Sequence, residues 1–138
     1  MRKLYSTLFL ASLVLLLSSG CSSKGMQKLS IQGALDDSRS NELLDPNIRL
    51  SFGDNGGSGK LWTSNKKTNA VNKEVDEGCN RAFMSAVIAL QDRAKKEGKT
   101  SVVDIHSYYK RKKFSSSTDF DCEAGAVMSG VTLRGRVQ

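Results

Sequence analysis

The chain has 138 residues, 38% of them hydrophobic and 25% charged, and a formal net charge of +7. A chain of this length folds as one domain at most and buries only a small core, which excludes a multidomain architecture. The basic balance favours contact with anionic surfaces such as lipid head groups or cell-wall polymers.

Residues 1–20 have the layout of a secretory signal peptide. Arg2 and Lys3 precede an apolar run over residues 4–17 that is too short to span a bilayer comfortably, and small residues follow. The SSGC ending resembles a bacterial lipobox, in which signal peptidase cleaves before a lipid-bearing cysteine, with Ser18 where leucine is usual. We therefore expect removal of residues 1–20 and lipidation of Cys21. The alternative is an ordinary cleaved signal followed by a free cysteine.

The predicted mature chain is exported and anchored in a membrane. Loss of Arg2 and Lys3 with the signal lowers the net charge from +7 to +5. Residues 21–28 lack apolar periodicity and are predicted to form a tether to a single domain over residues 29–138. Ser22 resembles the residue that sorts lipoproteins to the outer membrane, so we expect an outer-membrane protein that faces the periplasm. Nucleic acid is not an expected partner of an exported protein.

Short elements are predicted before the main helix. Residues 29–31 favour a brief strand, and residues 38–44 favour a turn or two of helix that ends before Pro46. Apolar side chains at positions 48, 50 and 52 alternate with polar ones, which indicates a half-buried strand.

A glycine-rich turn and a second strand follow. Residues 54–59 read DNGGSG and predict a mobile turn. Residues 60–63 predict a short strand that carries Trp62, the only tryptophan, and residues 64–71 predict a basic, polar connection.

Residues 72–98 predict the amphipathic helix around which the domain is organised. Acidic side chains lie in its first turn and Lys95 and Lys96 in its last turn, where they interact favourably with the helix dipole. Gly98 can adopt the left-handed conformation that ends a helix. One face carries the apolar side chains that we expect to meet the core. They are Cys79, Phe83, Ala86, Val87, Leu90 and Ala94, whereas Arg81, Ser85, Asp92 and Lys96 lie on the far side.

The segment after the helix is predicted to form an antiparallel meander. In its first strand Val103, Ile105, Ser107 and Tyr109 share one face, and residues 110–117 make a hairpin turn. The second strand alternates Thr118, Phe120, Cys122 and Ala124 with acidic residues, and the last carries Val127, Val131, Leu133 and Val137. The expected fold class is α+β, with one main amphipathic helix packed on a small, mostly antiparallel sheet in two layers.

Two apolar side chains of the predicted helix do not fit its core-facing stripe. Met84 and Ile88 lie roughly opposite that stripe, among charged neighbours. Either the N-terminal segment, with Leu35, Leu43 and Leu44, folds over them, or they belong to a partner-binding surface. The sequence leaves both interpretations open.

Four segments carry a resemblance to a known family: KKTNAVNK, CNRAFMSAVIALQDRAKKEG, SVVDIHSYYK and TDFDCEAGAVMSGVTLRG. Their order and spacing over residues 48–137 resemble small exported bacterial proteins that are often labelled excinuclease ATPase subunit and whose function is not established. A phosphate-binding loop requires G-x-x-x-x-G-K-[ST], but Asp54 stands at the first glycine and Leu61 at the hydroxyl position. The sequence therefore predicts no nucleotide and no cofactor, against that label.

The predicted architecture has a second, looser likeness. A helix followed by a meander is similar to RcsF-type outer-membrane lipoproteins, which sense stress, and to YbjQ-type domains, which are proposed to bind heavy metals. This likeness concerns the fold and the placement of cysteines rather than function. The chain has fewer domain cysteines than RcsF-type proteins.

Catalytic and metal-binding residues are sparse. His106 is the only histidine, and no serine or cysteine has a recognisable nucleophile setting, so we do not expect an enzyme. If a hairpin closed around residues 112–115, His106 would face Asp121 and Asp104 would face Glu123, a set able to hold a divalent ion. We favour a solvated charge face instead, because a single histidine rarely makes a metal site.

A basic run ends the first predicted strand of the meander. It consists of Lys110, Arg111, Lys112 and Lys113. Such a run is usually only solvated, and contact with phosphate-bearing lipopolysaccharide or anionic lipid would suit an envelope protein better than contact with DNA.

The remaining two cysteines are predicted to pair. Cys79 lies on the core-facing stripe of the helix, and Cys122 shares its strand face with Phe120. In an oxidising compartment these thiols would form a disulfide inside the layer between helix and sheet. A thiolate metal site is disfavoured because there is no CxxC spacing.

These features together predict a non-catalytic cell-envelope lipoprotein that binds a partner, senses the envelope or helps to maintain it. The expected partners are the membrane, through the lipid anchor, and an envelope protein or an anionic cell-surface polymer. A metal-binding domain of the YbjQ type is the alternative, and an enzyme of unknown type is third.

Overall fold

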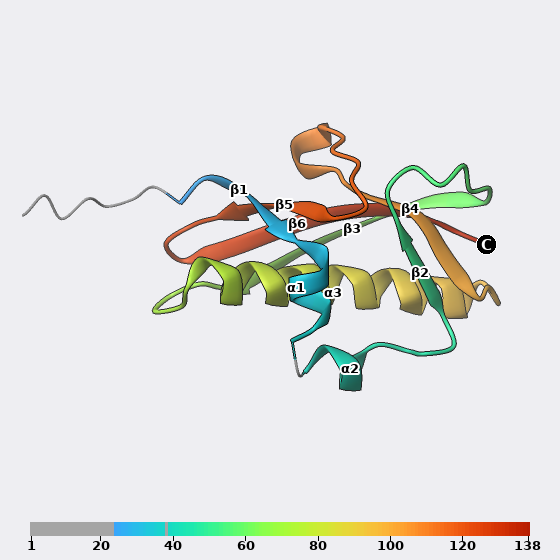
Figure 1. The fold of residues 1–138 in the computed structure, drawn as a ribbon, viewed down its shortest axis with the longest axis horizontal. Helices are drawn as coiled ribbons and strands as arrows, with labels where there is room; N and C mark the ends of the chain where they lie inside the picture. Colours follow the sequence, from blue (N-terminus) through green and yellow to red (C-terminus); the bar gives the residue numbers. More distant parts are fainter. Residues whose placement is uncertain (1–23, 38) are drawn as a thin grey trace, which may run out of the picture.

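The computed structural model describes residues 24–37 and 39–138. The long helix α3 packs on a curled, mixed sheet of six strands, which confirms the predicted α+β class (Figure 1). In chain order the elements are β1 (Met26–Ser30), α1 (Ile31–Leu35), α2 (Ser40–Leu43), β2 (Arg49–Phe52), β3 (Lys60–Asn69), α3 (Val75–Lys96), β4 (Ser101–Ser107), the short 3₁₀ turn η1 (Tyr109–Arg111), β5 (Asp119–Ala124) and β6 (Met128–Val137).

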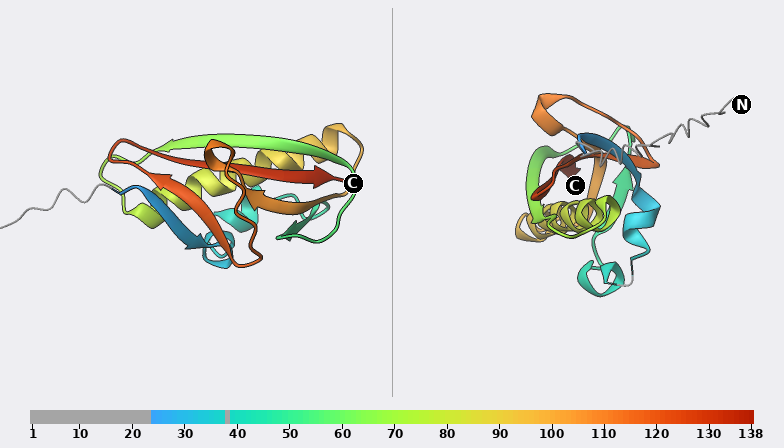
Figure 2. Two further views of the ribbon diagram at one scale, coloured as in Figure 1. Left: turned by 90° about the horizontal axis from the view of Figure 1, so that it is seen from above. Right: turned by 90° about the vertical axis from the view of Figure 1, so that its left-hand side faces the viewer.

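The strand β6 organises the sheet because it is long enough to pair with three others. On one side β3 runs antiparallel along its whole length, from Lys60 opposite Val137 to Asn69 opposite Met128. On the other side β5 pairs with the beginning of β6 and β4 with its end. β1 extends the sheet beyond β5, and β2 extends it beyond β4 in parallel (Figure 2).

The predicted meander and its hairpin turn are wrong. After β4 the chain leaves the sheet through η1, with left-handed backbone at Lys110 (φ 48°) and Arg111 (φ 65°), and returns as β5. This excursion is too long for a tight turn, so β4 and β5 lie end to end beside β6 instead of pairing with each other. The alternating pattern identified the strands but carried no information about their partners.

The strand β3 is much longer than predicted and includes most of the expected connection. Its alternation was hidden because inward-facing positions are polar: Ser64 is buried, and the Thr68 hydroxyl donates to the carbonyl of Gly78 at 2.9 Å. Among the described strands, β3 pairs only with β6, so its outer edge is unpaired. The exposed Lys66 and Lys67 suit such an edge, because charged side chains oppose the addition of another strand.

The N-terminal elements also differ from the expectation. β1 begins at Met26, inside the predicted tether, and Ile31 opens the helix α1 instead of ending a strand. The Ser30 hydroxyl accepts a hydrogen bond from the amide of Gly33 at 3.1 Å and so caps α1. The short helix expected before Pro46 is confirmed as α2.

The main helix confirms the prediction closely. It ends in a left-handed Gly98 (φ 66°), and the amide of Lys99 donates to the carbonyl of Ala94 at 2.8 Å, which satisfies a terminal carbonyl. The six side chains predicted to face the core are all at most 1% exposed: Cys79, Phe83, Ala86, Val87, Leu90 and Ala94.

The core fills the space between α3 and the sheet. The ring of Phe83 stacks on Phe120, with centroids 4.2 Å apart, and on Phe52 at 5.9 Å. Beside this stack, the predicted disulfide joins Cys79 of α3 to Cys122 of β5, with the Cα atoms 5.8 Å apart. The helix is therefore fastened to the sheet by packing and by a covalent bond.

The predicted faces of β4 are wrong because the strand contains an irregularity. Its pairing with β6 shifts register between Val103 and His106, where Asp104 has a φ of 52°. The Asp104 carboxylate accepts hydrogen bonds from the amides of Asn55 at 2.6 Å and Gly57 at 3.0 Å, which holds it toward the glycine-rich loop. As a result Val102 and Ile105 face the core, while Val103 is only half-buried.

Candidate functional site

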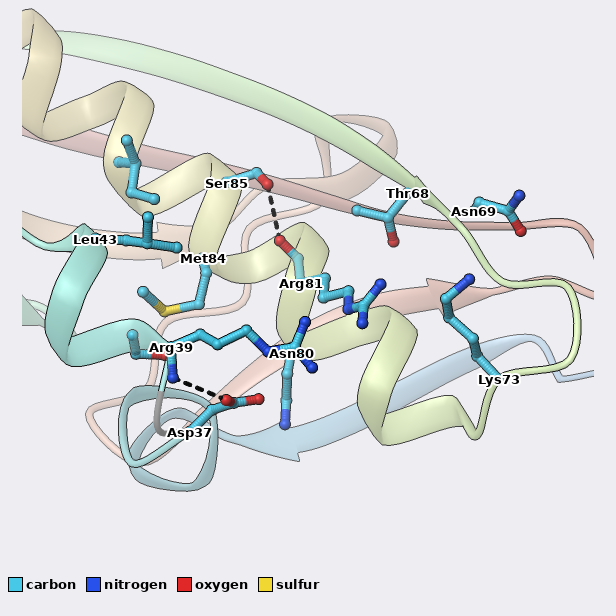
Figure 3. A pocket seen from close by; sticks show the side chains of 12 residues that line it. Asp37, Arg39, Leu43, Thr68, Asn69, Lys73, Asn80, Arg81, Met84 and Ser85 are labelled. Atoms are coloured by element: carbon cyan, nitrogen blue, oxygen red, sulfur yellow. Dashed lines mark hydrogen bonds between the residues drawn. The ribbon is translucent and has the colours of Figure 1, made fainter.

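A cavity of about 350 Å³ lies where α2, the end of β3 and the first half of α3 meet (Figure 3). We name it the α2–α3 groove and define it by six of its lining residues. The apolar members are Leu43, Met84 and Ile88, and the cationic members are Arg39, Lys73 and Arg81. In Figure 3, Leu43 and Met84 lie at one end, Lys73 lies at the other, and the two arginine side chains lie between them.

The apolar members connect the groove to the two helix residues that did not fit the core stripe. Met84 is covered by the N-terminal segment and is only 7% exposed, as the first interpretation predicted. Ile88 is half-buried and Leu43 is 59% exposed, so the covering is incomplete. The groove therefore keeps an accessible apolar surface beside the packed core.

The wall formed by α2 is held in place from both ends. At its first residue, the buried Ser40 hydroxyl donates to the carbonyl of Ala34 at 2.8 Å. After α2, the buried Gln91 of α3 accepts a hydrogen bond from the amide of Asp45 at 2.9 Å and donates to the carbonyls of Asp45 and Ile48. The Asp45 carboxylate also meets the ammonium of Lys95 at 2.8 Å, and this hydrogen bond lowers the pKa of Asp45.

The charge of the groove is predominantly positive. Its lining contains three cations and one carboxylate, Asp37, which accepts a hydrogen bond from the amide of Arg39 at 3.2 Å. Arg81 forms an ion pair with Glu77 at 2.8 Å, and its buried Nε atom has no hydrogen-bond partner among the described residues. The groove thus offers N–H donors next to an apolar surface, which suits a ligand that carries an acidic and an apolar group side by side.

The hydroxyl groups of the groove are occupied by backbone hydrogen bonds. Ser40 donates to Ala34, and Ser85 donates to the carbonyl of Arg81 at 2.9 Å (Figure 3). A nucleophilic serine requires an adjacent base, and the described lining residues place none beside these hydroxyls.

The structure does not bring the weak metal candidates together in the way that the hairpin required. His106 and Asp104 lie on β4, whereas Asp121 and Glu123 lie on β5, which pairs with β1 and β6 instead. The Asp121 carboxylate forms an ion pair with Lys28 at 2.9 Å. Within residues 24–37 and 39–138 no group of three or more histidine, cysteine or acidic side chains is placed to hold a metal ion.

The His106 side chain is buried and forms a hydrogen bond within its own strand. Its Nδ1 lies 2.7 Å from the carbonyl of Asp104, which can only accept, so Nδ1 carries the proton and donates. Burial lowers the pKa of His106, and the charges of Lys113 and Arg134 add to this effect, while the bond to Asp104 opposes it. A neutral imidazole with one fixed tautomer results.

The basic run 110–113 lies on the excursion between β4 and β5, and all four side chains are exposed. Lys113 pairs with Asp54 at 2.8 Å, and this hydrogen bond lowers the pKa of Asp54. Lys110 lies over the ring of Tyr109, 5.4 Å from its centroid. The run is therefore an exposed surface, as predicted. It lies in a loop that an antiparallel bridge between Ser107 and Phe114 closes, although β4 and β5 do not pair as a hairpin.

The predicted lipidation site, Cys21, lies outside the residues that the structure describes. Sequence reasoning missed Arg39, Lys73 and Arg81 as site residues. Arg39 reaches the other two only because the N-terminal segment folds across α3, whereas Lys73 lies in the loop that precedes this helix. The one signal in the sequence was the misfit of Met84 and Ile88.

The chain was compared with protein-family models, with curated proteins and with solved structures, and it matches none of them. None of the helices in the described part of the chain combines the length and the apolar character needed to cross a membrane.

Proposed function

We propose that this protein is a non-catalytic, lipid-anchored component of the cell envelope that binds a protein partner through the α2–α3 groove. The observation that carries the proposal is the pairing of an accessible apolar surface at Leu43 and Ile88 with an excess of cations at Arg39, Lys73 and Arg81. Charge complementarity favours a partner that presents an apolar side chain next to carboxylates.

Other features support the envelope setting. The Cys79–Cys122 disulfide suits an oxidising compartment such as the periplasm. The signal-peptide layout and the lipobox-like ending before Cys21 supply the export route and the anchor. Sensing or maintaining the envelope would follow from which partner is bound.

Site-specific photo-crosslinking in cells tests the groove. A photoreactive amino acid at Leu43, whose side chain is 59% exposed, is expected to give a discrete crosslinked product. The same amino acid at Lys112, which is exposed on the excursion between β4 and β5, serves as the matched control.

Charge reversal makes this test specific. The paired substitutions Arg39→Glu and Lys73→Glu are expected to remove the product formed at position 43, because they replace two cations of the groove with anions. The substitution Lys112→Glu is expected to leave it unchanged. A product at position 43 that survives both groove substitutions would refute recognition of an acidic partner.

A further inference from the structure

Exposed apolar side chains gather at one end of the domain. Met26, Val71 and Met128 are each 45% exposed, and Val127 is 63% exposed. They come from three places: the start of β1, the loop between β3 and α3, and the β5–β6 turn with the first residue of β6. Of the large apolar side chains that are exposed in the described residues, only Leu43 of the groove lies elsewhere.

Backbone contacts bring these segments to the same place. The amide of Ala70 donates to the carbonyl of Val127 at 2.7 Å, and Met128 pairs with Asn69. The amide of Ala124 donates to the carbonyl of Gly25 at 2.9 Å, which sets the start of β1 beside the β5–β6 turn. Figures 1 and 2 show the loop, the turn and the start of β1 at the same end of the long axis.

This end is also where the chain would reach its anchor. Met26 follows Cys21 by five positions, so the extended backbone between them spans about 18 Å at most. An anchored Cys21 therefore keeps these side chains closer to the bilayer than any other exposed apolar group. Exposed apolar side chains that converge in this way are expected to be covered by a partner surface.

We propose that Met26, Val71, Val127 and Met128, here named the apolar tip, insert into the surface of the bilayer that holds the lipid anchor. The inference rests on the proposed lipidation of Cys21 and adds a second, orienting contact to it. With the lipid anchor alone, the domain could rotate freely relative to the membrane. With the anchor and the apolar tip both in contact with the bilayer, the domain has a defined orientation.

Charge contributes little at the apolar tip. Lys24 lies near the start of α3, because its ammonium donates to the carbonyl of Lys73 at 3.4 Å. The acidic side chains of Glu74, at the N-cap of α3, and of Asp76, in its first turn, lie at the same end and offset the charges of Lys24 and Lys73. Insertion is therefore driven by apolar contact, and its depth depends weakly on the fraction of anionic lipid.

The inferred orientation leaves the groove open. The axis of α3, whose 22 residues span about 33 Å, points away from the apolar tip (Figure 1). The groove starts beside the tip, at Asn69 and Lys73, and its apolar residues Leu43, Met84 and Ile88 lie farther along this helix (Figure 3). A protein partner could reach these apolar residues parallel to the membrane surface without displacing the tip.

The test measures the depth of one position in the lipidated, full-length protein. The protein is purified from membranes and reconstituted in phosphatidylcholine vesicles, with Val127→Cys carrying an environment-sensitive fluorophore. The native cysteines do not compete for the label, since Cys79 and Cys122 are bonded to each other and Cys21 is proposed to be modified. Lys112→Cys, exposed on the excursion between β4 and β5, is the matched control.

We expect blue-shifted emission at position 127 and strong quenching by lipids that carry a spin label near the head group, with neither effect at position 112. Adding Val71→Asp and Met128→Asp should reduce the quenching at 127 to the level of the control. Replacing part of the phosphatidylcholine with phosphatidylglycerol should leave the emission unchanged.

The outcomes separate the tip from the anchor. A lipidated, vesicle-bound protein whose position 127 is as exposed as position 112 overturns the apolar tip and leaves the anchor intact. If the purified protein carries no lipid but the fluorophore at position 127 is still quenched by the spin-labelled lipids, the anchor is contradicted and the apolar tip is supported. If the protein carries no lipid and does not bind the vesicles, the anchor and the apolar tip are both contradicted. A blue shift at 127 that appears without vesicles and rises with protein concentration also overturns the proposal, because a second copy then covers the tip.

Discussion

The sulfur atoms of Cys79 and Cys122 are bonded to each other across 43 residues of sequence, between the first half of α3 and the middle of β5. Both side chains are fully buried. β5 and β1 form the part of the sheet that leads to the proposed membrane anchor, so the disulfide ties this part directly to the helix that lines the groove.

Removing this bond should destabilise the domain strongly. The variant Cys79→Ala with Cys122→Ala is expected to lose about 4 kcal/mol of unfolding free energy in the chain-entropy model, given the 43-residue separation. Urea denaturation of the variant and of the wild type measures the difference. The wild type with reductant should resemble the variant, and equal midpoints for all three would contradict the prediction. Alkylation of the unfolded, unreduced protein should modify neither cysteine.

The buried amide of Gln91 is expected to be the main structural support of the groove. Replacing it with methionine leaves the amide of Asp45 and the carbonyls of Asp45 and Ile48 without their side-chain partner. The Asp45 carbonyl keeps the amide of Ile48 as a partner at 3.2 Å, so the main cost falls on the carbonyl of Ile48, whose bond to Gln91 is buried. We expect a loss of roughly 2 kcal/mol in the free energy of unfolding, because a buried polar group left unsatisfied carries its full desolvation cost. Urea denaturation checks the size of the effect. Asp92→Asn, on the exposed side of the same turn, should change stability little and is the control.

Stability should fall in mild acid because of His106. Burial lowers its pKa below the ordinary value of about 6.5, so near and below this pH the unfolded chain binds a proton that the folded domain does not. The free energy of unfolding is therefore constant above this range and decreases as the pH falls through it.

Two measurements check the pH prediction. The resonance of the single histidine, followed by NMR in the folded protein, should titrate below the range of an unfolded peptide. Denaturation at about pH 7.5 and about pH 5.5 should show a smaller difference for His106→Gln than for the wild type. An unchanged pH dependence in the variant would assign the effect to other groups.

Lipidation of Cys21 is tested by metabolic labelling. Cells supplied with a fatty-acid probe should label the wild type and spare Cys21→Ala, because several acyl chains are attached to the cysteine of such a lipoprotein. Ser22 is expected to direct the labelled protein to the outer-membrane fraction. Equal labelling of the wild type and Cys21→Ala would refute the anchor. The variant Cys122→Ala, which lacks the disulfide but keeps Cys21, is the control for misfolding and should still be labelled.

The main helix and the disulfide could both be predicted from the sequence. The core stripe from Cys79 to Ala94 follows the period of an α-helix, and Gly98 ends the helix through its own backbone freedom. Cys122 was assigned to the inner face of its strand by alternation alone. The helix stripe, its glycine stop and the strand alternation each depend on residues close together in the chain. The pairing of Cys79 with Cys122 followed because they are the only two cysteines of the predicted domain.

The partners of the strands could not be predicted, because they depend on contacts between distant segments. Alternation at β4 and β5 is the same whether they pair with each other or lie end to end along β6, and the irregularity at Asp104 depends on contacts with a distant loop. β3 was missed beyond Thr63 because an edge strand tolerates inward polar side chains and exposed lysines.

The candidate site was likewise a product of folding. Arg39, Lys73 and Arg81 are separated in sequence and carry no shared motif, and the apolar tip joins residues from β1, from the loop after β3 and from the β5–β6 turn with the first residue of β6. Local pattern indicates which face of a regular element is apolar, as in α3, but it fails where distant contacts distort the element, as at Asp104 in β4. Which surfaces remain open is decided by how segments distant in the chain cover one another, and that is set by packing and by backbone hydrogen bonds across the whole domain.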